Sequence, residues 1–390
     1  MNEPLVARMR EFGTTVFAEM TALAVRTGSI NLGQGFPDTD GPPAMLDKAV
    51  EAIRSGLNQY PPGPGMPELR QAVSDHHKDR YGLAYDPDGE ILVTVGATEA
   101  ITSAVLALCE PGDEVIAFEP YYDSYAAAIA MAQAVRRPVT LRPVNGRFTF
   151  DPAELRAAVG PRTRAILVNS PHNPTGTVFT REELDEIAAV CAEHDLIAIT
   201  DEVYEHLTFD DAEHIPLATL PGMRERTVMI SSAGKTFSAT GWKTGWICAP
   251  APLVTAAQTV KQFLTFTANA PWQVAVAYAL RHETDWVTRL RADLQAKRDR
   301  LMSGLSAAGF EVLRPAGTYF VQTDIRPLGF TDGLDLTRRL PELAGVVAIP
   351  TQVFYDHAEA GRHFVRFAFC KRDEVIDEAV RRLTRLASGG

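Results

Sequence analysis

The middle of the chain alternates short apolar runs with longer segments whose apolar positions recur at helical spacing. The apolar runs are rich in β-branched residues and are followed by glycine or polar residues, which predicts strands buried on both faces. Strands are predicted at residues 91–95, 114–118, 165–168, 196–199 and 228–231. Helices are predicted at residues 98–109, 122–133 and 181–194, the last preceded by Thr180 as its N-cap. This alternation predicts an α/β fold with a parallel sheet between layers of helices.

The pattern changes towards the C-terminus. A charged amphipathic helix is predicted at residues 295–308, short strands at 319–323 and 363–369, and a final helix at 373–386. These elements predict a smaller α+β domain, which the N-terminal segment joins. We therefore expect a large domain of residues 40–285 and a small domain of residues 1–39 and 286–390.

Composition narrows the possible partners. The chain of 390 residues carries 49 acidic and 38 basic side chains, a formal net charge of −11, which argues against nucleic acid as a partner. Its four cysteines, Cys109, Cys191, Cys248 and Cys370, form no C-x-x-C pair and lie in apolar stretches, so buried reduced thiols are expected rather than disulfide or metal ligands. Residues 1–13 lack the apolar run of a signal peptide, and no run is long enough to span a membrane. We expect a cytoplasmic protein with no membrane partner.

Polar residues that could take part in binding or catalysis follow the predicted strands. Ligands of parallel sheets bind beyond the carboxyl ends of the strands. Asn173 lies there in a turn stiffened by two prolines and a glycine, although a tight turn alone explains that segment as well. Asp201 ends an apolar strand, where a carboxylate needs a cation unless it caps a helix. Tyr204, three residues later, reads equally as an ordinary half-buried tyrosine.

Lys235 follows the last predicted strand of this group, in the segment Ser232-Ala233-Gly234-Lys235. A lysine in a loop is most often only solvated. Here a serine and a second lysine, Lys243, accompany it after a buried strand, which suggests an anion site combined with a reactive amine.

Taken together, these residues form a specific pattern. In their order and separation, Asn173, Asp201, Tyr204, Lys235 and Lys243 resemble the signature of fold-type I, pyridoxal-5′-phosphate (PLP) dependent aminotransferases of class I and II. The resemblance covers nearly the whole chain. It implies a large domain with a mainly parallel seven-stranded sheet between helices and a small α+β domain. It also implies PLP as the cofactor, amino acids and 2-oxo acids as substrates, and no metal.

The resemblance further implies a role for each residue. Lys235 would hold PLP covalently and carry the substrate proton, with Asp201 and Tyr204 as the other catalytic residues. Asp201 would keep the pyridine nitrogen protonated, Tyr204 and Asn173 would face the ring phenolate, and Tyr122 the ring face. The phosphate would be bound by Gly96, Ala97, Thr98, Ser232, Lys243 and, from the neighbouring subunit, Tyr60. Lys243 replaces the commoner arginine, so it would bind phosphate as a point charge. A homodimer with shared active sites is expected.

The chain resembles the kynurenine and glutamine aminotransferase branch at residues 31–37, 58–60, 232–243 and 365–369, the first of these being a substrate-side segment. Arg366 would bind the substrate α-carboxylate in a bidentate manner, with Asn173, Gly35 and Phe17 around the substrate. Residues 60–65, 326–330 and 369–373 most resemble bacterial N-succinyldiaminopimelate aminotransferases, which implies transamination between N-succinyl-LL-diaminopimelate and 2-oxoglutarate in lysine biosynthesis.

Several alternatives remain open at this stage. One is a broad-specificity kynurenine, glutamine or methionine aminotransferase, which the aromatic Phe17 would suit. Another is a cysteine-conjugate carbon–sulfur β-lyase, which shares the same residues around the cofactor. A ligand-sensing regulator is disfavoured, because the resemblance begins within the first few tens of residues and the chain is acidic.

Overall fold

A seven-stranded sheet forms the centre of the computed structural model, which describes residues 4–13 and 15–388. The strand order is β2-β10-β9-β8-β7-β3-β4. All neighbouring pairs are parallel except those made by β10, which runs against both β2 and β9. The strands are β2 (Ile91–Val95), β3 (Glu114–Glu119), β4 (Val135–Thr140), β7 (Thr163–Asn169), β8 (Ile197–Asp201), β9 (Thr227–Ser232) and β10 (Thr244–Cys248). The expected mainly parallel sheet is confirmed.

Helices bury both faces of this sheet, because alternate residues of each strand contribute to different cores. Leu92 packs with α4, α5 and α9, whereas its neighbour Val93 packs with α2, α3 and α10. Towards β4, the second face is covered by α6 and α7. These helices are α2 (Pro43–Arg54), α3 (Pro67–Tyr81), α4 (Gly96–Leu108), α5 (Asp123–Met131), α6 (Pro152–Ala157), α7 (Arg181–Glu193), α9 (Ala251–Lys261) and α10 (Ala270–His282). Thr180 caps α7 as predicted, in a reciprocal capping box with Glu183.

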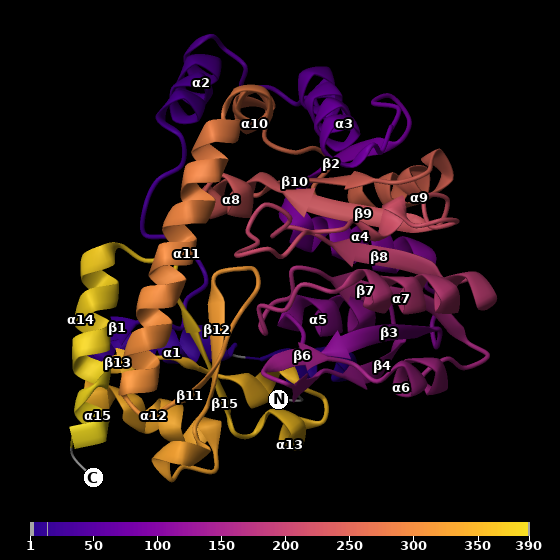
Figure 1. The fold of residues 1–390 in the computed structure, drawn as a ribbon. Coiled ribbons are helices and arrows are strands. Elements are labelled where there is room, and N and C mark those ends of the chain that lie inside the picture. Colours follow the sequence, from indigo (N-terminus) through magenta and orange to yellow (C-terminus); the bar gives the residue numbers. More distant parts are fainter. Residues whose placement is uncertain (1–3, 14, 389–390) are drawn as a thin grey trace.

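A second, four-stranded antiparallel sheet lies in the C-terminal part, in the order β11-β12-β15-β14. The strands are β11 (Glu311–Leu313), β12 (Phe320–Asp324), β14 (Ile349–Pro350) and β15 (Phe364–Ala368). Its core is shared with α11 (Thr284–Ala307), α12 (Gly333–Ala344) and α14 (Asp373–Leu383). Figure 1 shows α11, in orange, running from the seven-stranded sheet to the smaller one.

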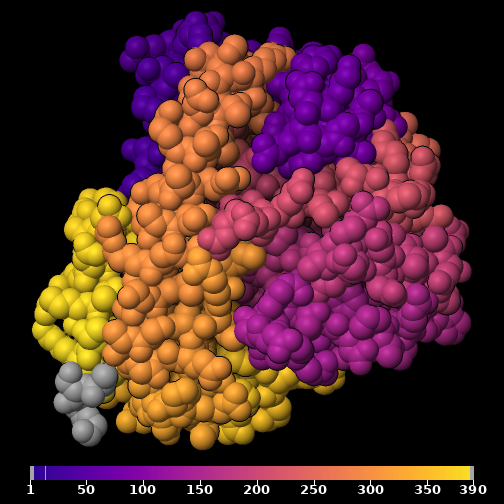
Figure 2. Space-filling model, in the orientation of Figure 1, coloured from indigo at the N-terminus to yellow at the C-terminus, as the bar shows by residue number. Residues whose placement is uncertain are grey.

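The N-terminal segment packs with the C-terminal part, as the sequence suggested. Strand β1 (Ile30–Asn31) pairs in parallel with β13 (Val346–Val347), and α1 (Val16–Thr27) packs beside them. In the space-filling view, the orange and yellow C-terminal residues pack against the magenta residues of the large sheet (Figure 2). We retain domain boundaries at residues 40 and 285 as a proposal, since every strand of the large sheet lies between them.

The remaining elements are short. They are β5 (Arg142–Val144), β6 (Arg147–Thr149), α8 (Ala233–Thr236), α13 (Ala358–Gly361) and α15 (Arg385–Ser388), with 3-10 turns at Ala7–Phe12, Leu217–Thr219, Thr240–Trp242, Arg326–Leu328 and Thr351–Phe354. All four cysteines are free and buried, as predicted. Within the described ranges, no helix has the length and apolar character needed to cross a bilayer.

Two predicted helices differ from the structure. The helix predicted from residue 295 begins earlier, at Thr284. Charged residues in its first turns hid its apolar face, although Leu290 and Leu294 contact the core. The final helix ends at Leu383, and Arg385–Ser388 forms a separate turn. Strands β4 and β10 were not predicted, since β4 contains two arginines and a proline and β10 contains Gly245 and few β-branched residues.

Candidate active site

A cavity of about 360 Å³ lies at the carboxyl ends of the parallel strands, where the two sheets face each other. Every site residue predicted from the sequence lines this cavity except Tyr60. The large sheet and its loops contribute Gly96, Ala97, Thr98, Tyr122, Asn173, Asp201, Tyr204, Ser232, Lys235 and Lys243, and the N-terminal segment and small sheet contribute Phe17, Gly35 and Arg366. The topology therefore brings together side chains that are far apart in the sequence.

Lys235 stands in the one-turn helix α8, directly after β9. Its Nζ lies 5.7 Å from the ring centres of both Tyr204 and Tyr319. Burial lowers the pKa of the Lys235 amine to about 8, although the neighbouring Cys370 and Asp201 act in the opposite direction. About a tenth of this amine is therefore unprotonated at pH 7, far more than for an ordinary lysine, and able to act as a nucleophile or base.

Asp201 is the last residue of β8, and its carboxylate is buried. Burial raises the pKa of this carboxyl, and a hydrogen bond from the Tyr125 hydroxyl to Oδ2, at 2.5 Å, opposes that shift. Asp201 forms no ion pair with any described lysine or arginine, so the cation that a buried carboxylate requires is not supplied by this part of the chain. This arrangement leaves the carboxylate available to a cationic group of a ligand.

Arg366 lies on β15 and is only 1% exposed. Its Nη1 donates to Asn173 Oδ1 at 3.0 Å, and its Nη2 donates to the carbonyl oxygen of Gly33 at 2.9 Å. Nε is buried and makes no hydrogen bond within the described chain. Burial lowers the pKa of the guanidinium to about 10. A buried arginine without a carboxylate partner is a ready site for a carboxylate of the substrate.

One end of the cavity is suited to an anion. Helix α4 begins there at Gly96, whose φ of +72° is left-handed, and Lys243 Nζ lies 3.4 Å from Thr98 Oγ1. A Cβ at Gly245 would lie 2.8 Å from the carbonyl carbon of Gly96, so only glycine allows β10 to approach the helix this closely. The helix N-terminus, Lys243 and Ser232 together place backbone amides, an ammonium group and a hydroxyl around the same space.

Aromatic rings form the walls of the cavity. Tyr122 precedes α5 and makes an edge contact with Tyr125, with ring centres 5.9 Å apart. Burial raises the pKa of Tyr122 to about 12, so its hydroxyl stays protonated at neutral pH. On the substrate side, Phe320 stacks on the guanidinium of Arg366 at 4.0 Å and Phe17 lies 5.4 Å from it. A Cβ at Gly35 would lie 2.5 Å from the ring of Phe320, so the wall requires glycine there.

Tyr60 is the predicted residue that lies outside the cavity. Its side chain is 81% exposed and makes an edge contact with Phe266, with ring centres 5.3 Å apart. The expected role of Tyr60 in a neighbouring subunit is not tested by a single chain and stays a prediction.

Tyr125, Asn169 and Phe320 are among the residues that contact the predicted site residues but received no role from the sequence. Tyr125 binds Asp201 directly, and Asn169 joins the loops by accepting from the Asn173 amide and donating to the carbonyl of Asp201. Phe320 covers Arg366. The position of Asn169 at the end of a strand was visible in the sequence, but nothing distinguished Tyr125 from the neighbouring Tyr121 and Tyr122.

Comparison with known proteins gives a consistent result. A family model described as "Aminotransferase class I and II" matches residues 27–383. A probable N-succinyldiaminopimelate aminotransferase of Mycobacterium tuberculosis is 54% identical over 98% of both chains, and a solved structure of N-succinyldiaminopimelate aminotransferase from that organism superposes with a TM-score of 0.96, covering 98% of this chain and 100% of the other. The methionine aminotransferase of Escherichia coli is 39% identical over 99% of this chain and 100% of its own.

Proposed function

Because the chain belongs to the family of class I and II aminotransferases, we propose that it uses PLP to exchange an amino group between N-succinyl-LL-diaminopimelate and 2-oxoglutarate. The aminotransferase activity follows from the family. The substrate pair is supported by the 54% identity, over nearly the full length of both chains, to a relative named for N-succinyldiaminopimelate. The observation that carries the proposal is the convergence of Lys235, Asp201 and Arg366 on one cavity.

The residues of the cavity fit PLP in charge and in space. The buried Asp201 carboxylate has no basic partner among the described residues, which suits a protonated pyridine nitrogen. At the other end, the start of α4, Ser232 and Lys243 suit a phosphate dianion. We assign Tyr204 and the Asn173 amide to the phenolate oxygen of the ring and Tyr122 to its face.

When bound, PLP supplies an aldehyde that reacts with amines and a ring that accepts the electron pair left by the departing α-proton. Lys235 is the amine we assign to hold the cofactor. Once released by an incoming substrate amine, Lys235 Nζ is free to accept the proton from the substrate α-carbon and to return it elsewhere as a general acid. Its lowered pKa of about 8 makes both the acceptance and the return of that proton feasible near neutral pH.

Arg366 sets the orientation of the substrate. A carboxylate paired with its guanidinium would gain charge-assisted hydrogen bonds, and the unpartnered Nε provides a donor that no described residue uses. Asn173 and Gly33 hold the other two nitrogens, so the plane of the guanidinium is fixed before substrate arrives. This preorganisation points the α-carbon of the substrate towards the same cavity as Lys235.

The bound substrate requires a second anion site if it carries a succinyl group. The basic residues that line the cavity are Lys235, Lys243 and Arg366, and each already has an assigned role. Ser124 also lines the cavity, and its buried hydroxyl makes no hydrogen bond within the described residues. We assign Ser124, together with Gln34, to the distal part of the substrate.

A second candidate activity is favoured by the aromatic walls. Phe17, Phe36 and Phe320 suit an apolar or aromatic side chain such as that of methionine or kynurenine, and the Escherichia coli relative is named for methionine. A carbon–sulfur β-lyase would use the same cofactor residues, and release of pyruvate and ammonia from a cysteine conjugate would reveal it.

We also propose a homodimer. Phe263 is 82% exposed, and Leu264, Phe266 and Tyr60 are exposed as well. These side chains form an apolar surface of the kind that marks protein–protein contacts. Pairing of two chains through this surface would cover it and bring Tyr60 towards the partner's cofactor.

The deciding experiment is a single-turnover assay on the holoenzyme that follows the visible absorbance of the bound cofactor. The amino donors compared are N-succinyl-LL-diaminopimelate, glutamate, glutamine, kynurenine and methionine. Fast reaction with the first two alone supports the proposed substrate pair. Fast reaction with kynurenine, glutamine or methionine instead assigns the enzyme to the broad-specificity activity, and reaction with none of them refutes both.

A further inference from the structure

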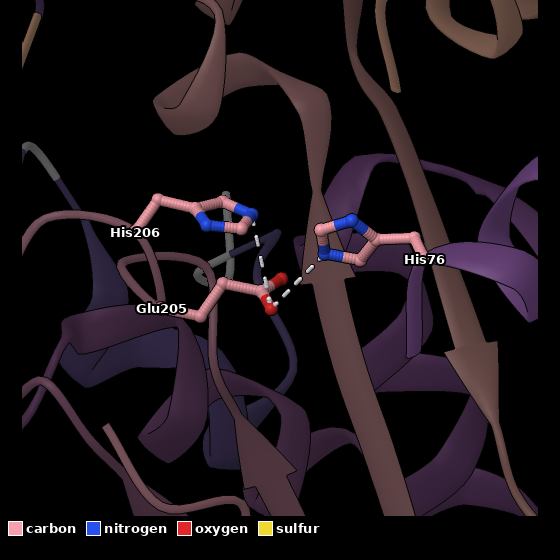
Figure 3. A group of neighbouring side chains, drawn as sticks. All are labelled: His76, Glu205 and His206. Carbon is pink, nitrogen blue, oxygen red and sulfur yellow. Dashed lines mark ion pairs between the residues drawn. The ribbon is translucent and has the colours of Figure 1, made fainter. Parts of the chain in front are cut away.

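A second group of chemically capable side chains lies outside the active-site cavity. His76 comes from α3, and Glu205 and His206 come from the turn after β8, directly following Tyr204. Figure 3 shows both imidazole rings directed at the carboxylate of Glu205. Glu205 Oε2 lies 3.6 Å from His76 Nε2 and 3.9 Å from His206 Nε2, and one potential ligand atom from each residue lies within 4.8 Å of the others.

The carboxylate of Glu205 is fully buried and is held in place by hydroxyl groups. The Tyr81 hydroxyl donates to Oε2 at 2.6 Å, and the Ser231 hydroxyl donates to Oε1 at 2.5 Å. A carboxyl group that accepts a hydrogen bond at each oxygen is stabilised in its ionised form. In the described part of the chain, the basic side chains within 4 Å of this carboxylate are the two histidines, and no lysine or arginine forms an ion pair with it. The site therefore combines a buried negative charge with no permanent cation.

The two histidines present ring nitrogens that are free for a ligand. His206 is buried, and its Nε2 faces the carboxylate of Glu205. His76 Nε2 is buried and makes no hydrogen bond within the described residues. Two imidazoles and one carboxylate form a donor set that divalent zinc accepts.

We propose that His76, Glu205 and His206 form a binding site for a divalent transition metal of the zinc class. Tetrahedral zinc separates its ligand atoms by about 3.3 Å, so small side-chain movements would complete the geometry. A cavity of about 710 Å³ is lined by both histidines and leaves room for water as the fourth ligand. His76 is far in sequence from the adjacent pair Glu205 and His206, and the three residues match no metal motif, which is why the sequence alone predicted no metal site.

The metal would act as a cross-link in the fold. It would join α3 to the turn that follows β8 and carries Tyr204. Thr236, the neighbour of Lys235, lines the same cavity, and Ser231 on β9 binds Glu205. We therefore expect the metal to stabilise the elements that carry Tyr204 and Lys235, without contacting the reacting atoms.

The test uses PLP-loaded protein that has been treated with a chelator and dialysed. Zinc is titrated by calorimetry, and retained zinc is counted by elemental analysis. We expect one zinc ion per chain and a rise in the melting temperature on zinc addition. Magnesium, which prefers oxygen ligands, should give neither effect.

Two variants and a matched control locate the site. His76→Gln and His206→Gln should each weaken zinc binding more than tenfold and abolish the rise in melting temperature. His194→Gln changes an exposed histidine at the end of α7 and should behave as the wild type. Equal zinc binding by all three variants, or no zinc binding by the wild type, overturns the proposal.

A cobalt experiment on the wild-type chain covers the case in which a variant does not fold. Cobalt bound by two imidazoles and a carboxylate gives the intense visible bands of a four-coordinate ion, and stoichiometric zinc should remove them. Only the weak bands of six-coordinate cobalt would contradict the proposed donor set.

Discussion

Within the described chain, Asp201 and Arg366 in the active-site cavity each have neutral hydrogen-bond partners and form no ion pair. Asp201 accepts from the Tyr125 hydroxyl, and Arg366 donates to the Asn173 amide and the Gly33 carbonyl. If these two residues paired with each other, neither would have charge left for a ligand. Neutral partners fix the orientation of both side chains while leaving their charges uncompensated, which is the condition for strong binding of an amino acid and a cationic ring.

Removal of the Lys235 amine should abolish catalysis but leave the protein folded. We expect Lys235→Ala to lose nearly all turnover and the visible absorbance of covalently held cofactor, because no other lysine has this position after β9. Absorbance spectra and a transamination assay check this, with the exposed Lys48→Ala as the control. A Lys235→Ala protein that kept both properties would remove Lys235 from the mechanism.

The pKa of Lys235 predicts how cofactor capture depends on pH. Burial places this pKa at about 8, below the ordinary value for lysine, and only the unprotonated amine attacks an aldehyde. The rate at which cofactor-free protein takes up PLP should therefore fall about tenfold per pH unit below pH 8 and level off above it. Stopped-flow absorbance between pH 6.5 and 10 measures this rate. A midpoint near pH 10 would show an amine with an unperturbed pKa.

At the scale of the elements, close contact between β10 and α4 shapes the anion end of the cavity. Strand β10 runs against its neighbours and brings Gly245 against the backbone of Gly96 and Ala97. The same strand follows Lys243, whose left-handed conformation turns its side chain towards the start of the helix. The ammonium group and the helix N-terminus are thus placed by a single backbone contact.

Substitution in that contact should weaken cofactor binding. A Cβ at Gly245 would lie 2.8–2.9 Å from backbone atoms of Gly96 and Ala97, so Gly245→Ala must shift the start of α4. We expect the dissociation constant for PLP to rise at least about tenfold, equivalent to about 1.4 kcal/mol, measured by fluorescence titration. Gly241→Ala is the control, since no atom lies within 4 Å of its added Cβ. Equal affinities would show that the contact does not shape the anion site.

The predictability of these elements differs for physical reasons. Buried, β-branched strands such as 91–95 and capped helices such as 181–194 carry their own pattern and were predicted almost to the residue. Strand β10 carries no such pattern, because its identity depends on pairing with strands distant in sequence. For the same reason, the sequence did not reveal the contact of Tyr125 with Asp201 or the group of His76, Glu205 and His206. Both depend on contacts between residues that are distant in sequence. The residues after each predicted strand were the part of the site that sequence order revealed.

At the scale of the whole molecule, an exposed apolar surface lies next to the active site. Phe263, Leu264 and Phe266 follow α9, and Thr265 between them donates a hydrogen bond to Glu99 in the first turn of α4. The surface is therefore connected to the helix whose N-terminus we assign to the cofactor phosphate. Covering this surface in a dimer would stabilise that helix as well.

Charge placed on this surface should break the proposed dimer. We expect Phe263→Glu to shift the protein from dimer to monomer and to lower activity, because two carboxylates would be buried without partners. Analytical ultracentrifugation gives the mass, and a transamination assay gives the activity. Val144→Glu, on the exposed strand β5, is the matched control. A wild-type monomer, or a Phe263→Glu dimer, would contradict this arrangement.

The N-terminal wall of the cavity is held through its main chain. The carbonyl oxygens of Gly33, Gly35 and Phe36 accept hydrogen bonds from Arg366, Tyr319 and Lys371. These anchors do not depend on the side chain of Phe36, so position 36 can vary without releasing the wall, whereas Gly35 cannot. The side chain of Gln34 ties the wall to α1 by donating a hydrogen bond to Thr21. Evolution can therefore change substrate choice at position 36 by single substitutions that leave the catalytic groups undisturbed.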